Sequence, residues 1–208
     1  MGLTLITAPV AEPVTIAEAR AQLRVVTSGS PASHPEDDLI NGLITASREA
    51  AEKHTGRAFV KQVWDLSLDS FPTSSSTPVF LPMPPLISVD QITYTDSAGN
   101  PQTWDAAKWQ VDTTDAQARL RPAPGEIWPV VQADLLGGAL IRFTAGYSGD
   151  GASPESFIAN VPQAVKQAML MLITHWFENR GAAIVGTISE ETPMAVGTLL
   201  WPYRVVTF

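Results

Sequence analysis

The sequence predicts an α+β fold, with a helical core of about three to four helices and an inserted antiparallel β segment. Two observations lead to this prediction. Helical patterns of apolar residues flank a long middle segment, and the hydrophobic period changes from 3.6 residues to two at Phe59 and back at Pro162. We therefore expect an N-terminal helical part at 1–58, a β-rich insertion at 59–146, a C-terminal helical part at 147–200 and a tail at 201–208.

Composition limits the classes of function. The chain has 208 residues, of which 45% are hydrophobic and 16% charged. The charged share lies below the roughly 25% of typical soluble domains, so part of the surface suits protein contacts. A formal net charge of −8 argues against a protein that grips nucleic acid by counterion release. Cysteine is absent, which excludes disulfides and thiolate metal sites.

No membrane segment or signal peptide is expected. The longest apolar run, 168–173, is far shorter than the roughly 18 to 20 residues of a membrane-spanning helix. The first residues contain neither a basic region nor a long apolar stretch.

Two helices are predicted before the β segment. Thr15 is a good N-cap, and Glu18 three residues later completes a capping box for a short helix that ends near Arg24. A second helix is expected over 36–54, with acidic residues in its first turn and Gly56 as its C-terminal stop.

Alternating residues predict strands in the middle segment. Over 64–68 the alternation places Trp64, Leu66 and Leu68 on one core-facing side. The pattern slips at Asp90–Gln91, which indicates a bulge, and 96–100 is typical of a hairpin turn. Further strands are expected at Val79–Leu81, Ile87–Thr95, around Trp104, at Trp109–Val111, Ala118–Leu120 and Ala139–Ala145.

A third helix is expected over 162–178, because Pro162 suits a first turn. Its core stripe includes Val165, Met169, Leu172 and Trp176, and further apolar residues beside the stripe indicate burial or contact with a partner. Residues 194–200 are expected to form one more short helix.

Candidate catalytic and metal-binding residues are few. His175 and Glu178 lie one helical turn apart, but the other histidines are isolated, so we expect no metal site. The segment 146–151 resembles a G-x-S-x-G nucleophile elbow only superficially, because Asp150 stands at a position that needs glycine. We expect no enzyme activity and no cofactor.

Two carboxylate pairs are candidates for acid–base catalysis. The pair Asp37 and Asp38 is explained by the first turn of a helix, and the pair Glu190 and Glu191 by a solvated loop. Two alternatives stay open: a carbohydrate- or receptor-binding module and a small hydrolase. Several exposed tryptophans in a groove would favour the first, and a tight Ser/His/Asp or carboxylate cluster the second.

Several short segments, in this order, resemble the head–tail connector (adaptor) proteins of tailed phages, a family also found in prophages and gene transfer agents. Each segment is weak evidence alone, but together they span nearly the whole chain. They are 13–24, 36–40, 51–57, 81–89, 161–166, 175–180, 185–187 and 200–204.

The resemblance implies a structural protein of the virion neck, assembled in the host cytoplasm. It implies a homo-oligomeric ring, as a rule a dodecamer, that binds the portal protein on one side and a stopper or tail-terminator protein on the other. DNA would pass through the ring without specific binding, and no membrane would be involved. Family members commonly dock on the portal through their C-terminal segment.

In this chain that segment is the tail, which we expect to be loosely ordered in the free subunit. Its residues are Trp201, Pro202, Tyr203, Arg204, Val205, Val206, Thr207 and Phe208.

Overall fold

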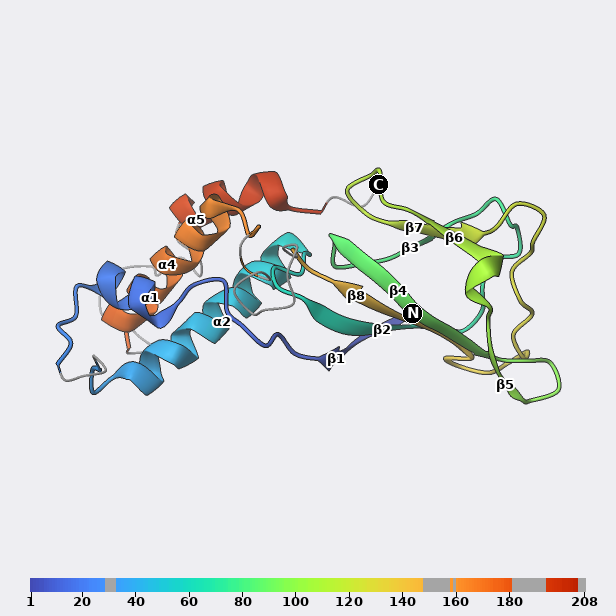
Figure 1. The fold of residues 1–208 in the computed structure, drawn as a ribbon, viewed down its shortest axis with the longest axis horizontal. Coiled ribbons are helices and arrows are strands. Elements are labelled where there is room, and N and C mark those ends of the chain that lie inside the picture. The colour runs from blue at the N-terminus through green and yellow to red at the C-terminus, as the bar shows by residue number, and fades with distance from the viewer. Residues whose placement is uncertain (29–32, 148–157, 159, 181–193, 206–208) are drawn as a thin grey trace. The chain divides into compact units, whose positions relative to one another are not determined.

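The structure, a computed structural model, describes residues 1–28, 33–147, 158, 160–180 and 194–205. They fall into two compact units. The sheet unit takes in Met1–Val10 and Val60–Ser148, and the helical unit takes in Ala11–Phe59 and Gly149–Phe208. Four α-helices and two antiparallel sheets occur in the described residues, which confirms the predicted α+β class (Figure 1).

A five-stranded antiparallel sheet is the main element of the sheet unit (Figure 1). The strand order is β1-β2-β8-β4-β5, so β1 and β5 form its two edges. The central strand β8 is buried at five of its seven positions, and its four buried apolar residues, Ala139, Ile141, Phe143 and Ala145, alternate along the strand and so share one face. The strands are β1 (Gly2–Thr7), β2 (Gln62–Leu68), β8 (Ala139–Ala145), β4 (Leu86–Thr95) and β5 (Pro101–Thr103).

Strand β1 differs from the sequence prediction, which assigned residues 1–58 to the helical part. In the structure β1 pairs with β2, with Leu3 opposite Leu66 and Leu5 opposite Trp64. Its alternating leucines are a strand pattern, but the partner strand lies far along the chain. Local periodicity therefore could not reveal that these residues join the sheet.

Two local predictions in the sheet are confirmed. The pairing of β4 with β8 shifts between Val89 and Gln91, which places a bulge at Asp90. At the end of β4, the backbone N–H of Asp96 donates to the carbonyl of Asn100 at 2.9 Å. This bond closes the expected hairpin between β4 and β5.

A second, three-stranded sheet has the order β3-β7-β6. A short 3₁₀ turn, η1 (Ala106–Lys108), leads into β6. The strands are β3 (Val79–Phe80), β6 (Trp109–Asp112) and β7 (Arg119–Pro122), close to the predicted positions.

Four aromatic rings gather in the core of the sheet unit. Phe71 stacks on Trp128 with ring centroids 5.1 Å apart, and Trp104 lies 5.4 Å from Trp128. Tyr94 meets Phe71 edge to face. Trp104 lies outside any strand, contrary to expectation, because its buried side chain belongs to this cluster. The cluster ties the loop after β7 to β4 and to the segment after β2.

The helical unit begins with the two predicted helices. Thr15 and Glu18 form the expected capping box at the start of α1 (Ile16–Leu23). Helix α2 (Asp37–Thr55) ends at Gly56, which adopts a left-handed conformation with φ 69°.

Helix α2 packs against α4 (Gln163–Glu178), and α4 also packs against α5 (Met194–Leu200). Trp176 is half-buried rather than part of the core. Among the described residues, no helix has the length and apolar character needed to cross a membrane. Residues buried between these helices include Ile40, Ile44, Ala51, Val165, Ala168, Met169, Leu172, Val196 and Leu200.

A buried ionic network lies along α2. Arg48 Nε donates to Glu12 Oε2 at 2.9 Å, and Arg48 Nη1 donates to Glu52 Oε2 at 2.7 Å. Glu12 also accepts from the hydroxyl of Thr45 at 3.1 Å. The other oxygen of Glu52 accepts from the backbone N–H of Phe59 at 2.7 Å. The network therefore holds both ends of the first helical segment, Ala11–Phe59.

The aromatic cluster yields a stability prediction. Trp128→Ala should destabilise the sheet unit by about 3–5 kcal/mol, because it removes a buried ring from between Phe71 and Trp104. The matched control Ile127→Ala, whose side chain is 73% exposed, should change stability by no more than about 0.5 kcal/mol. Urea unfolding followed by near-ultraviolet circular dichroism measures both, and equal losses would contradict the assigned role of the cluster.

Candidate functional site

The predicted docking tail begins directly after α5. Trp201–Tyr203 forms a 3₁₀ turn, η2, and Arg204 and Val205 continue in extended form. The Trp201 side chain is 65% exposed, which is unusual for so large an apolar group. The last three tail residues, 206–208, lie outside the described residues.

The first part of the tail is tied to the end of α2. Arg57 Nε donates to the carbonyl of Tyr203 at 2.5 Å, and the backbone N–H of Val205 donates to the carbonyl of Thr55 at 2.7 Å. The Arg204 guanidinium lies 5.6 Å from the centroid of the Trp201 ring. The expectation of a loosely ordered tail is therefore wrong for residues 201–205, because these bonds fix their backbone.

This arrangement suits protein binding. An exposed aromatic on a fixed backbone loses little conformational entropy when a partner covers it. Tryptophan is also among the residues most enriched at the energetic centres of interfaces. Trp201 is thus an exposed aromatic side chain on a fixed backbone in the helical unit.

A second apolar surface, the β7–β8 loop (residues 123–138), was missed by the sequence analysis. Ile127, Val130 and Leu136 are 73%, 71% and 87% exposed. A row of apolar residues between prolines and glycines at 127–131 was the available signal. Such a concentration of exposed aliphatic side chains is typical of an interaction surface.

The β7–β8 loop is held in place by bonds to other loops. Trp128 Nε1 donates to the carbonyl of Thr77 at 3.3 Å, and the backbone N–H of Gly137 donates to Asp69 Oδ1 at 2.8 Å. The backbone N–H of Gln132 donates to the carbonyl of Thr95 at 2.9 Å. The exposed aliphatic groups therefore stand on a fixed backbone, as Trp201 does.

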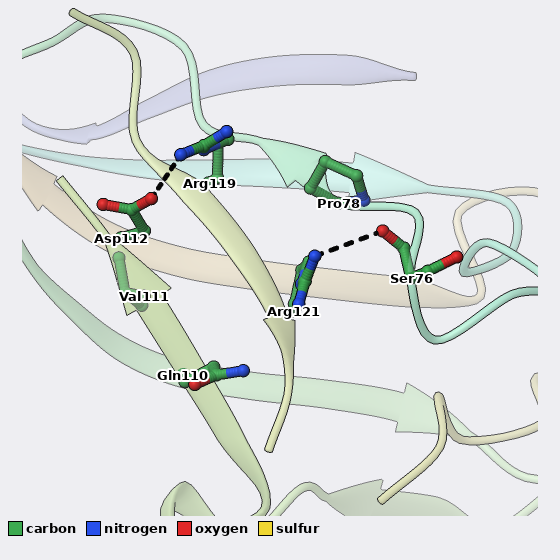
Figure 2. A pocket seen from close by; sticks show the side chains of 7 residues that line it. All are labelled: Ser76, Pro78, Gln110, Val111, Asp112, Arg119 and Arg121. Atoms are coloured by element: carbon green, nitrogen blue, oxygen red, sulfur yellow. Dashed lines mark hydrogen bonds and ion pairs between the residues drawn. The ribbon is translucent and has the colours of Figure 1, made fainter. Parts of the chain in front are cut away.

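A hollow of about 480 Å³ lies beside the smaller sheet (Figure 2). Its charged groups are already paired: Arg119 binds Asp112, and Asp115 lies 3.2 Å from the same guanidinium. Arg121 Nη1 reaches the carbonyl of Ser76 at 3.5 Å, as Figure 2 shows. The residues that line it are Ser76, Pro78, Gln110, Val111, Asp112, Arg119 and Arg121.

The chemistry of this hollow does not favour catalysis. Hydrogen bonds from Thr114, and then from Arg119, lower the pKa of Asp112 to about 2. A carboxylate held ionised in this way is a weak general base and cannot act as an acid near neutral pH. The hollow is therefore a salt-bridged surface feature.

The other candidate residues also have structural partners. Asp37 binds Arg20 and accepts from the backbone N–H of His34 at 2.8 Å. The hydrogen bond from Arg20, followed by that from His34, lowers the pKa of Asp37. His175 lies in the last turn of α4, where Asn179 caps its carbonyl. No cluster of three or more His, Asp or Glu suited to a metal occurs in the described part of the chain.

Two candidate segments cannot be placed. Most of the glycine-rich segment 146–151 and both Glu190 and Glu191 lie outside the described residues.

The tryptophans do not form an exposed platform. All six lie in the described residues, and Trp201 is the exposed one. Trp64 was expected on a core face, but it is half-buried because its cross-strand neighbour is the exposed strand β1. The others are buried at Trp104 and Trp128 and half-buried at Trp109 and Trp176.

Comparisons with protein-family models and with curated proteins found no match. Solved structures match along the whole chain. A chain in the neck of an empty gene transfer agent particle, with C6 symmetry, has a TM-score of 0.77 and 27% identity. A chain in the virion of a native gene transfer agent particle has a TM-score of 0.75 and 26% identity. A chain in the neck of the native particle, with C12 symmetry, has a TM-score of 0.71 and 24% identity.

Each of these alignments covers 100% of this chain and 97% of the other. They confirm the resemblance to the head–tail connector family.

The anchored tail yields a prediction about proteolysis. Arg57→Gln removes the bond to the Tyr203 carbonyl and should expose the tail more often, because such a bond contributes about 1 kcal/mol. Trypsin should then cleave after Arg204 about fivefold faster. Lys53→Gln, which removes an exposed cation from the last turn of α2, should leave this rate unchanged. Equal rates in wild type and Arg57→Gln would show that the tail is held by other contacts.

Asp112 yields a prediction about pH. Its carboxyl has a pKa of about 2 in the folded chain against an ordinary 3.8, so its contribution is present above about pH 4 and is lost as pH falls toward 2. Asp112→Asn should lower the thermal midpoint at neutral pH, and the gap to wild type should close between about pH 4 and pH 2. Asp115→Asn removes a more exposed carboxylate that also pairs with Arg119, and it should lower the thermal midpoint by less. A gap that persists at pH 2 would contradict this assignment.

Proposed function

We propose that this chain is a structural, non-enzymatic subunit of the neck of a tailed phage or phage-like particle. In detail it is a head–tail adaptor that forms a homo-oligomeric ring between portal and tail and conducts DNA. The observation that carries the proposal is the end-to-end match to chains of a gene transfer agent neck. The working location is the virion, after assembly in the host cytoplasm.

The surfaces of the chain support an assembly role. A ring subunit needs two different faces, because each contact is heterologous and closes by rotation. The chain carries several separate uncharged surfaces, among them Trp201 and the β7–β8 loop. The C6 and C12 symmetry of the matched particles agrees with a ring, and we propose a dodecamer.

Partners follow from the same proposal. The tail 201–208 would bind the portal protein, with Trp201 as the anchor. A stopper or tail-terminator protein would bind on the tail side. DNA would pass without specific binding, because the net charge of −8 leaves few cations for phosphates.

The two alternatives are less well supported. A carbohydrate-binding module would need several exposed tryptophans, and Trp201 is the one that is exposed. A hydrolase would need a paired nucleophile and base, whereas the carboxylates of Asp37 and Asp112 bind arginines.

The direct test is deletion of the gene from the particle-producing strain. We expect DNA-filled heads without attached tails, because the ring that joins them is missing. Purified full-length chain added to these heads should restore tail attachment. Particles with complete necks after the deletion would overturn the proposal.

Trp201 yields a prediction within this test. Trp201→Ala should weaken binding of the chain to tailless heads about 30-fold, because truncating a central aromatic anchor commonly costs about 2 kcal/mol. The control Val26→Ala changes another apolar residue of the helical unit, one that is 86% exposed and outside the tail. Its binding should equal that of wild type. Sedimentation of fluorescent chain with heads gives both affinities, and an unchanged Trp201→Ala affinity would move the docking site elsewhere.

A further inference from the structure

Strand β1 is an open edge of the five-stranded sheet (Figure 1). It pairs with β2 on one side, and no described strand pairs with its other side. All six of its residues are exposed, and Leu3, Leu5 and Ile6 are 38%, 41% and 45% exposed. A row of backbone N–H and C=O groups is therefore available to another extended chain.

The other edge strands of the described sheets carry features that discourage such pairing. The opposite edge of the same sheet is β5, which has three residues and begins with Pro101. In the smaller sheet β3 has two residues, and β6 ends in the charged Asp112. Proteins use short length, proline and charge in this way to prevent edge-to-edge association.

Strand β1 has none of those protections. Its sequence is Gly-Leu-Thr-Leu-Ile-Thr, without charge or proline, and it is the longest of the four edge strands described. The one irregularity is a register shift between Leu5 and Thr7. Asp65, which lies opposite Thr4, is neutralised by Arg142 through two bonds of 2.8 and 2.7 Å. An incoming strand would thus meet a neutral, partly apolar edge.

We infer that β1 is a contact between subunits of the ring, where an extended segment of the neighbouring copy of this chain adds to the sheet. This inference rests on the proposed function. The occupant is a second copy, because every subunit of a symmetric neck has a neighbour. The rotation that relates neighbouring subunits then brings the same segment of one copy to the β1 edge of the next, all around the ring. The occupant is not the neighbour's β1, since β1-to-β1 pairing is isologous and would stop at a dimer.

The contact combines two interactions. Backbone hydrogen bonds along β1 provide affinity, as in other cases of strand addition. The side chains of Leu3 and Leu5 provide an apolar face for the neighbour. Lysines at these two positions would weaken the contact, because their charges would have to be buried against the apolar side chains of the added strand on the same face of the sheet.

The test uses assembled particles and three full-length variants. The first, Leu3→Lys with Leu5→Lys, should fold as wild type does, since both side chains are more than one-third exposed. Its amount in purified necks should fall at least about tenfold, measured by quantitative mass spectrometry. The charge-matched control, Gln102→Lys with Thr103→Lys on β5, should be incorporated normally.

The third variant carries photoreactive benzoylphenylalanine in place of Thr4. Irradiation of particles should give a species of twice the subunit mass that contains peptides of this chain alone. Normal incorporation of the β1 lysine variant, equal loss in the β5 control, or crosslinks from Thr4 to a different protein would overturn the inference and leave the proposed function standing. Absence of the wild-type chain from necks would overturn both.

Discussion

The buried network of Arg48 with Glu12 and Glu52 is the constraint on which the arrangement of the helical unit depends. Burial alone would lower the pKa of Arg48, but Glu52 and then Glu12 more than compensate and raise it. In such a buried ionic group, the attraction between the charges roughly offsets the cost of removing them from water, so the net contribution to stability is small. Loss of one partner leaves an uncompensated buried charge, which costs about 3–5 kcal/mol. The network therefore selects one arrangement of the chain more than it adds stability.

That arrangement concerns the entry and exit of the chain. Glu12 lies where the chain arrives from β1, and Phe59 lies where it departs toward β2. Both are held to α2, Glu12 through Arg48 and Phe59 through Glu52. Both ends of the segment Ala11–Phe59 are thus held to the same helix.

The same end of α2 also holds the tail. Within one helical turn after Glu52, the Thr55 carbonyl accepts from Val205, and Arg57 then donates to Tyr203. The backbone that carries Trp201 is therefore hydrogen-bonded to the end of α2, close to Glu52 of the buried network. The exposed Trp201 side chain thus stands on a backbone that has little freedom to lose and is directly connected to the core of its unit.

The sequence was a good guide wherever the determining contacts are local. The capping box at Thr15, the stop at Gly56 and the bulge at Asp90 each depend on neighbours within a few residues. It was a poor guide to β1 and to the anchored tail. Their partners, Leu66 for Leu3 and Thr55 for Val205, lie far away in the chain, and such pairings leave no periodic signal.

Most of the arginines are engaged within the fold, which leaves few cations for binding nucleic acid. All nine arginines lie in the described residues, and five of them form ion pairs with carboxylates. These five are Arg20, Arg48, Arg119, Arg142 and Arg180. Two more, Arg57 and Arg204, are engaged with the tail.

Phosphate binding needs cations that are free to replace counterions. In this chain most guanidinium groups already stabilise the fold, and the remaining balance is acidic. The ion pairs that hold the helices and strands together thus also occupy most of the guanidinium groups that phosphate binding would need.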